Sequence, residues 1–391
     1  MDTLTGMKRT DYCGNFTTEQ IGQEVTVYGW AQRQRDLGNL IFIDLRDRTG
    51  ILQLSFNDAT DREIFAKAQS VRSEYVLAAT GTLQKRESVN KELKTGEIEL
   101  AVTDLRVLSK AQTPPFEIAN ADKVGDETTL KYRYLHLRNE RLTQNLLMRH
   151  KIAKIAREYF YGHDFVEIET PMLIKSTPEG ARDYVVPSRV HKGKFYALPQ
   201  APQQFKQLLM TSGFDRYFQI APCFRDEDAR GDRSPGEFYQ LDMEMAFATQ
   251  DDVFAVLEDV LPPIFAKYGT YNVASAAPFR RIAYNDAMET YGSDKPDLRF
   301  GNPLIELTDY FKNTPFRVFQ APYVGAVLFK GGAATPRRQF DAWQDWAKQR
   351  GAKGLAYVVF AENGELKGPV AKNLSEEERN GLKEAVGAED G

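Results

Sequence analysis

Residues 217–247 read YFQIAPCFRDEDARGDRSPGEFYQLDMEMAF, and this stretch decides the fold of the central part of the chain. Two alternating apolar runs flank a loop that is dense in charge, which predicts an antiparallel hairpin with a long loop. On the returning strand, Gln240, Asp242 and Glu244 recur at period two. Because residues at period two project from the same side of a sheet, these three side chains are expected to line one surface.

Arg225 and Glu227 follow the first strand of this hairpin and are expected beside the same surface. A guanidinium together with several carboxylates suits a polyanionic substrate, which offers a phosphate to the arginine and hydrogen-bond donors to the carboxylates. The alternative interpretation is an exposed hairpin with surface ion pairs, since charged hairpins are common.

The composition indicates a globular protein of more than one domain. At 391 residues, with 42% hydrophobic and 27% charged residues, the chain exceeds a single usual core. No apolar stretch reaches membrane-spanning length and the N-terminus lacks a signal-peptide core, so we expect a cytoplasmic protein without a membrane partner. Cys13 and Cys223 have no metal-ligand spacing, so no metal site is predicted and both are expected to stay reduced. A net charge of −4 restricts any RNA contact to local basic patches.

Residues 20–110 alternate in a way that predicts five strands with a helix between the third and the fourth. That arrangement describes an OB-fold, which binds single-stranded nucleic acid with aromatic and basic side chains. The candidate contacts are Arg33, Arg35, Phe42 and Gln53. Phe42 is equally well interpreted as a core aromatic. The expected strands are Glu24–Arg33, Leu40–Arg46, Gly50–Phe56, Tyr75–Leu83 and Gly96–Leu108, with the helix at Asp61–Arg72.

The rest of the chain alternates between helical and strand patterns. After a linker at 111–140, helices are predicted at Arg141–Tyr161, Pro202–Thr211 and 251–268, and a strand at Phe165–Glu169. From about Glu306 a separate α+β unit is expected, with strands at Phe316–Phe319, Gly325–Phe329 and Gly354–Phe360 and a helix at Pro336–Arg350. The predicted fold class is therefore multidomain α+β.

Several long motifs in order resemble the bacterial-type aspartyl-tRNA synthetases, a family of class II aminoacyl-tRNA synthetases. FRDED…F…QLDME resembles motif 2, and FVEIETPML (165–173) resembles motif 1. STPEGARDYVVPSR and FYALPQAPQQFKQLLM are similar to the amino-acid-binding segments, and YGSDKPDLRFG (291–301) to the bacterial insertion domain. The resemblance covers about residues 8–391.

The resemblance implies a domain plan and a homodimer. Residues 1–110 would form the anticodon-binding OB-fold, 111–140 the linker, 141–300 the N-terminal part of an antiparallel-sheet catalytic domain, and 301–391 the insertion domain. Within the linker the family usually has Asp where His136 stands, and we expect His136 to make a polar contact between domains. Leu37 resembles the residue of enzymes that are specific for the aspartate tRNA.

The resemblance also implies ATP-dependent activation of L-aspartate and its transfer to tRNA(Asp), with ATP and Mg²⁺ as cofactors. Arg225 would bridge the α-phosphate and the aspartate carboxylate and is the catalytic candidate. ATP would also meet Asp226, Glu227 and Ser234. Lys206 would bind the aspartate side chain, oriented by Asp242, with Glu179 and Gln203 at the α-amino end and Gln240 nearby. Phe42 and Gln53 would hold the central anticodon base, beside Arg33 and Arg35.

Two departures from the family pattern bear on function. The loop 231–238 is one residue longer than usual, with Ser234 where a Gln normally touches ATP. A His-His segment, a Gly-Gly-Gly-Ser-x-Arg strand and the Gly-Leu-Asp-Arg motif 3 are not found, so we expect an incomplete enzyme with little or no aminoacylation activity by itself. The alternative is a non-catalytic tRNA- or RNA-binding protein. A lysyl or asparaginyl enzyme is disfavoured by the TPEGARDY segment and the insertion.

Overall fold

The protein is described from a computed structural model, which covers residues 1–177, 179–228, 235–272 and 276–390. The chain separates into two compact units, Met1–Ala274 and Ser275–Gly391, and each is described by itself. Within the described residues, no helix combines the length and the apolar character that crossing a membrane requires.

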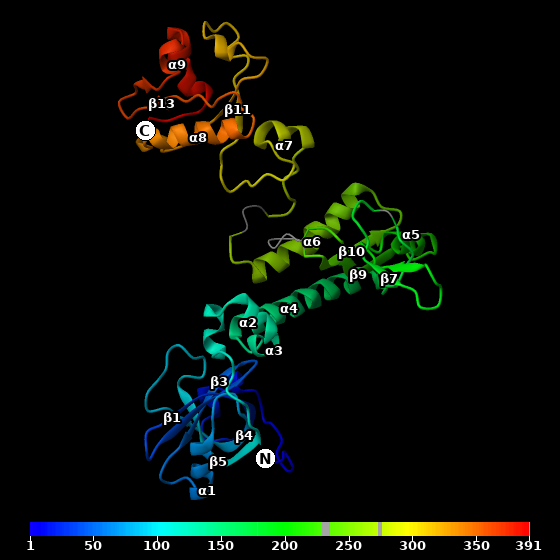
Figure 1. The fold of residues 1–391 in the computed structure, drawn as a ribbon, viewed down its shortest axis with the longest axis vertical. Coiled ribbons are helices and arrows are strands. Elements are labelled where there is room, and N and C mark those ends of the chain that lie inside the picture. Colours follow the sequence, from blue (N-terminus) through cyan, green and yellow to red (C-terminus); the bar gives the residue numbers. More distant parts are fainter. Residues whose placement is uncertain (178, 229–234, 273–275, 391) are drawn as a thin grey trace. The chain divides into compact units, whose positions relative to one another are not determined.

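The first unit begins with a closed five-stranded barrel (Figure 1, blue to cyan). Its strands pair in the order β1-β2-β3-β5-β4, antiparallel except for the parallel pair β3 and β5. The interior is filled by fully buried aliphatic side chains, among them Ile41, Ile43 and Leu45 from alternate positions of β2. The predicted OB-fold is confirmed. The elements are β1 (Glu24–Asp36), β2 (Ile41–Asp47), β3 (Gly50–Phe56), α1 (Arg62–Ser70), β4 (Val76–Lys85) and β5 (Ile98–Ser109).

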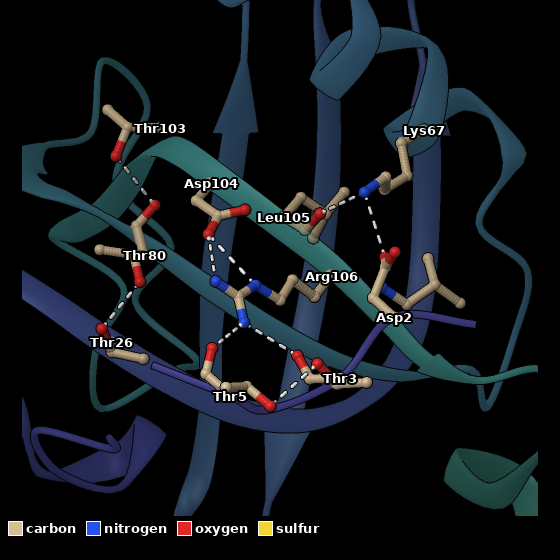
Figure 2. Close-up of polar contacts among 11 residues, drawn as sticks. Asp2, Thr3, Thr5, Thr26, Lys67, Thr80, Thr103, Asp104, Leu105 and Arg106 are labelled. Carbon is tan, nitrogen blue, oxygen red and sulfur yellow. Dashed lines mark hydrogen bonds and ion pairs between the residues drawn. The ribbon is translucent and has the colours of Figure 1, made fainter. Parts of the chain in front are cut away.

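An N-terminal segment is tied along the outside of β5 (Figure 2). The Arg106 guanidinium donates to the carbonyl oxygens of Thr3 and Thr5, at 2.9 and 2.7 Å. Asp2 accepts from the Lys67 ammonium at 3.1 Å and from the backbone N–H of Val107 at 2.8 Å. The N-terminal segment therefore adds polar contacts to β5 of the barrel.

The linker forms short helices around a small core of its own, made of Phe116, Ile118, Ala121 and Leu135. These are η3 (Ile118–Lys123), α2 (Asp126–Lys131) and α3 (Arg133–His136). His136 is buried edge-on against Phe116 and lies 3.1 Å from an Arg133 nitrogen. His136 was expected to make a polar contact between domains, and its contact with Arg133 lies within the linker, whereas Arg138 contacts the barrel.

Arg138 donates to Glu74 of the barrel at 2.7 Å, and its guanidinium lies over the Trp30 ring. Glu74 also accepts two bonds from Arg46, at 2.9 and 2.8 Å, and is nearly fully buried. A buried carboxylate without a partner would be strongly destabilising, and here two arginines compensate its charge. This pair of contacts anchors the end of the linker to the barrel.

The remainder of the first unit contains a three-stranded sheet with the order β10-β9-β6, in which β6 runs parallel to β9, and a separate two-stranded sheet of β7 and β8. The predicted hairpin is present, and its register pairs Asp242 with Gln219 and Gln240 with Ala221. The elements are α4 (Glu140–Gly162), β6 (Val166–Glu167), β7 (Val185–Pro187), β8 (Phe195–Ala197), α5 (Gln203–Thr211), β9 (Arg216–Phe224), β10 (Glu237–Met245) and α6 (Gln250–Tyr268).

The two faces of this sheet differ in chemistry. The apolar face is covered by α4 and α6, whose Phe160, Val256, Val260 and Ile264 pack with Phe218 of β9. Phe160 stacks on Phe218 with 4.7 Å between the ring centroids. Side chains alternate along a strand, so this packing directs the polar residues of β9 and β10 to the opposite face.

The second unit is an α+β fold with two separate two-stranded sheets. The prediction of a strand at Phe316–Phe319 is wrong, because that stretch contains the 3-10 helix η4 (Arg317–Phe319). The strand expected over Gly354–Phe360 is reduced to two residues. The elements are α7 (Tyr284–Tyr291), β11 (Leu304–Glu306), β12 (Gly325–Val327), α8 (Arg337–Gln349), β13 (Val359–Phe360), β14 (Leu366–Lys367) and α9 (Glu376–Ala385).

Candidate active site and nucleic-acid interface

The polar face of the β9–β10 hairpin meets the first turns of α5. Lys206 of α5 donates to Asp242 Oδ1 at 2.8 Å and lies 3.3 Å from Glu244 Oε2. The side chains of Lys206 and Asp242 are only 11% and 9% exposed. Burial alone would lower the pKa of Lys206, but the hydrogen bond and charge of Asp242, with the charge of Glu244, outweigh it and raise the pKa. The site thus holds a fixed cation beside two carboxylates.

A buried thiol lies among the predicted site residues. Burial and the charge of Asp242 raise the pKa of Cys223 to about 11, and Arg225, Glu179 and Lys206 also act on this thiol electrostatically. Cys223 donates to the Gln240 side-chain oxygen at 3.3 Å. The structure therefore brings residues of β9, β10, α5 and the loop after β6 around one point, although they are far apart in sequence.

Glu179 and α5 border a small cavity of about 100 Å³. Its wall also includes Ala201, Gln204 and Phe205, which precede and begin α5. Gln203 lies three residues before Lys206, so both side chains are on the same face of the helix. Glu179 is exposed, and neither Gln203 nor Lys206 is among the residues that line this cavity.

Arg225 follows β9 directly and its backbone N–H donates to the Gly236 carbonyl at 2.8 Å. The guanidinium lies over the Phe238 ring, 4.9 Å from its centroid, on the same strand face as Gln240. Asp226 is half-buried and Glu227 is exposed next to it. Ser234, predicted to touch ATP, lies outside the described residues, as do residues 231–233 of the same loop.

On the barrel, the predicted base-reading residues gather on the outer surface of β1, β2 and β3. Phe42 is half-buried, and it alternates with the core residues Ile41 and Ile43, so it faces outward and is no core aromatic. The Arg35 guanidinium lies 5.4 Å from the centre of the Phe42 ring and donates to Gln53 at 2.8 Å. Arg33 is exposed two residues earlier on β1.

Three further residues belong to this surface and were missed from sequence. Arg86 donates to the Gln53 side-chain oxygen at 2.8 Å, while Gln53 donates to Glu99 at 2.5 Å. Asp44 accepts from Arg35 at 3.2 Å. The Nε atoms of Arg35 and Arg86 are buried and have no hydrogen-bond partner in the described part of the chain. A buried donor without an acceptor is costly, so the Arg35 and Arg86 side chains carry an unsatisfied donor each at this surface.

Among the residues that the structure describes, no three His, Cys, Asp or Glu side chains lie together in a way that could hold a metal ion. A larger cavity of about 500 Å³ occurs in the second unit, beside Arg280, Tyr291 and Lys295. It contains none of the predicted site residues.

Two known families match this chain, one over the barrel and one over residues of both units. Residues 125–372 match the family described as tRNA synthetases class II (D, K and N). Residues 25–108 match the family described as OB-fold nucleic acid binding domain. An aspartate–tRNA(Asp/Asn) ligase of Bifidobacterium longum (strain DJO10A) is 57% identical over 98% of this chain, and a protein of the same name from Corynebacterium aurimucosum is 53% identical over 98%. The chain spans 64% and 63% of the length of these two relatives.

Solved structures with a similar fold include the asparaginyl-tRNA synthetase of Pyrococcus horikoshii complexed with asparaginyl-adenylate. Its TM-score is 0.63 at 23% identity, covering 72% of this chain and 66% of that one. An aspartyl tRNA synthetase from Entamoeba histolytica gives a TM-score of 0.59 at 24% identity, covering 73% of this chain and 63% of that one. At these identities the similarity concerns the fold alone.

Proposed function

Because the chain belongs to the class II tRNA synthetases of the D, K and N type, we propose that it binds L-aspartate, ATP and tRNA(Asp) as an aspartate–tRNA ligase. The name of its relatives supports aspartate as the amino acid. The observation that carries the proposal is the buried Lys206 ammonium, held by Asp242 and Glu244 on the polar strand face. A fixed cation of this kind selects a substrate carboxylate.

The preference for aspartate over asparagine follows from this cation. The aspartate side chain would share the Lys206 ammonium with Asp242 and accept a charge-assisted hydrogen bond from it. An asparagine amide is neutral and would form at most a weaker, uncharged hydrogen bond with the same ammonium, so the site would prefer aspartate. Glu179 and Gln203 are proposed to accept hydrogen bonds from the substrate α-ammonium group.

The first reaction step would be attack of the aspartate α-carboxylate on the α-phosphorus of ATP. The new bond joins the carboxylate oxygen to phosphorus, and the bond to the pyrophosphate oxygen breaks, which leaves aspartyl-adenylate. Arg225 would bind both the carboxylate and the α-phosphate through its forked donors and stabilise the charge that develops there. Asp226, Glu227 and Ser234 are proposed to contact ATP, and Gln240 to contact the amino acid.

Mg²⁺ would enter with the ATP phosphates. Catalysis would then depend on positioning and electrostatics, without a nucleophilic side chain. The Cys223 thiol, with a pKa of about 11, stays protonated at neutral pH and is no nucleophile.

The barrel surface is proposed to bind the anticodon of the tRNA. Phe42 would stack on a base, and Gln53, Arg33 and Arg35 would bind base edges and phosphates. Arg86 and Glu99 are proposed to orient the Gln53 amide, because Arg86 donates to its oxygen and Glu99 accepts from its nitrogen. We further propose that the protein is a homodimer and acts in the cytoplasm.

The test measures two kinds of binding with the 391-residue chain. A non-hydrolysable aspartyl-adenylate analogue should bind more tightly than the asparaginyl analogue, and Lys206→Met should remove that difference. An anticodon stem-loop of tRNA(Asp) should bind, and Phe42→Leu should weaken it by about 1–3 kcal/mol. Binding of the RNA without either adenylate analogue would instead support the non-catalytic RNA-binding function.

A stem-loop of tRNA(Asn) tests the range of tRNA substrates. The relatives are named for both tRNA(Asp) and tRNA(Asn). Leu37, which is exposed in the loop after β1, predicts preference for tRNA(Asp). Equal affinity for the two stem-loops would refute that preference without affecting the proposed activity.

A further inference from the structure

Three residues between β6 and β7, Ala181–Asp183, are held from one side by Gln200. The Gln200 side chain donates to the Ala181 carbonyl at 2.9 Å and accepts from the Ala181 N–H at 3.3 Å. It also donates to Asp183 Oδ1 at 2.5 Å, while the other oxygen of Asp183 accepts from Ser176. Gln200 is 3% exposed and lies three residues before α5. One buried amide therefore fixes both ends of this segment to the entry of α5.

The same segment is held from the other side by the end of β9. The backbone N–H of Asp226 donates to the Arg182 carbonyl at 2.9 Å. In return, Arg182 Nε donates to the Asp226 carbonyl at 2.9 Å. Asp226 directly follows Arg225, the residue proposed to bind the α-phosphate. The segment thus lies between the part of the site assigned to aspartate and the part assigned to ATP.

We propose that Ala181–Asp183 mechanically couples the two halves of the site, and that Gln200 and Arg182 are positioning residues for the reaction. This inference rests on the proposed function. Glu179 lies two residues before the segment, so the hydrogen bonds of Gln200 to the segment also restrict the position of Glu179 relative to Lys206. Because each half is bonded to the segment by two or more hydrogen bonds, ordering of either half by a ligand orders the other.

A direct backbone bond between the same two regions supplies an internal reference. The Phe224 N–H donates to the Pro199 carbonyl at 2.9 Å, and this bond does not involve the segment. If the segment is loosened, the Asp226 amide should therefore exchange its hydrogen faster, while the Phe224 amide stays protected from exchange. General loss of stability would release both amides together.

The first experiment is hydrogen exchange, read residue by residue on the full chain without ligands. Gln200→Leu should accelerate exchange at Ala181 and Asp226 at least tenfold and leave Phe224 within a factor of two. Gln207→Leu, a matched change at an exposed position of α5, should alter none of these amides. Equal acceleration at Phe224 and Asp226, or no acceleration at Asp226, would overturn the proposal.

The second experiment uses Arg182→Met, which removes one exposed side-chain donor and leaves the backbone bond in place. Titration calorimetry measures the affinity for L-aspartate with and without a non-hydrolysable ATP analogue. In the unchanged chain the analogue should tighten aspartate binding fivefold or more, and Arg182→Met should reduce this effect to less than twofold. Arg189→Met, at an exposed position between β7 and β8, should retain it.

The two experiments separate the two hypotheses. If the unchanged chain binds neither L-aspartate nor the ATP analogue, the proposed function fails, and the exchange pattern still decides whether the segment couples the two regions. If both ligands bind and Arg182→Met retains the full fivefold effect, the positioning role of Arg182 is wrong and the proposed function stands.

Discussion

Replacing Lys206 with Met tests whether the buried cation organises the polar face of the hairpin. The ammonium is 2.8 Å from Asp242 and 3.3 Å from Glu244, and the Asp242 side chain is 9% exposed. The second oxygen of Asp242 is buried and has no hydrogen-bond partner among the described residues. Removal of Lys206 would therefore leave a buried carboxylate without its compensating charge.

Breaking a buried ion pair from one side costs about 3–5 kcal/mol, because the remaining charge is desolvated and unpaired. Since about 1.4 kcal/mol corresponds to a tenfold change in an equilibrium constant, amides of β9 and β10 should exchange roughly 150- to 4,000-fold faster in Lys206→Met. Adding Asp242→Asn to Lys206→Met should restore a large part of the lost stability, since no uncompensated charge then remains at position 242.

Hydrogen exchange is the suitable assay, because the chain has three tryptophans and all lie outside the sheet region. Exchange of the β9 and β10 amides therefore reports the stability of this sheet directly, whereas tryptophan fluorescence would report other parts of the protein. The matched control is Lys154→Met on α4. Lys154 pairs with Glu158 at 3.5 Å, but the side chains are 65% and 63% exposed. An exposed pair of this kind is worth about 0.3–0.5 kcal/mol.

The pH dependence gives a second check. Because the pKa of Lys206 is raised in the folded chain, its ion pair contributes stability that is fully present below the usual value of 10.5 and is lost as pH rises through the higher folded value. The unchanged chain and Lys206→Met differ in stability, as read from the exchange rates of the β9 and β10 amides. This difference in stability should therefore become smaller above about pH 10.5. If Lys206→Met and Lys154→Met alter exchange equally, the buried cation does not stabilise the site and the reasoning is refuted.

Three further predictions concern the barrel and the thiols. Hydrogen bonds from the Val107 N–H and from Lys67 lower the pKa of Asp2, so the stability that ionised Asp2 contributes is present above pH 3.8 and is lost as the pH falls further. Asp2→Asn should therefore reduce the loss of barrel stability below pH 3.8, by less than about 1 kcal/mol. Gly81→Ala would press a Cβ into a backbone carbonyl of β5 and should destabilise the barrel by about 2 kcal/mol or more in thermal unfolding, whereas Gly125→Ala meets open space and should not. Both cysteines are buried, so a thiol reagent at pH 8 should label neither before denaturant is added.

The barrel could be predicted from sequence because its strands carry local signals. Period-two alternation placed Phe42 and Gln53 on strands that the structure contains. Glu99 and Arg86 could not be found in this way. Gln53 is opposite Glu99 only because β3 and β5 run side by side and parallel, and that pairing joins segments 46 residues apart. Alternation within a strand carries no information about such a neighbour.

The error at Phe316–Phe319 has a different physical cause. Two aromatic residues around Arg317 and Val318 have high strand propensity. In an extended strand, Phe316 and Phe319 would point to opposite faces, since they are three residues apart. In a 3-10 turn, side chains at this spacing lie on the same side. The two rings are 4.9 Å apart and both pack into the core of the second unit, so burial in a small core outweighed strand propensity.

The position of the active-site face depends on packing behind the sheet. A one-residue shift of β10 against β9 would turn every β10 side chain to the other face of the sheet. Such a shift would bury Asp242 and Glu244 against the apolar helices α4 and α6 and turn Met243 and Met245 away from the core that contains Phe218. The cost of burying two unpaired carboxylates fixes the register. The residues that pack on Phe218 therefore determine where Lys206 finds its partners, although none of them touches the site.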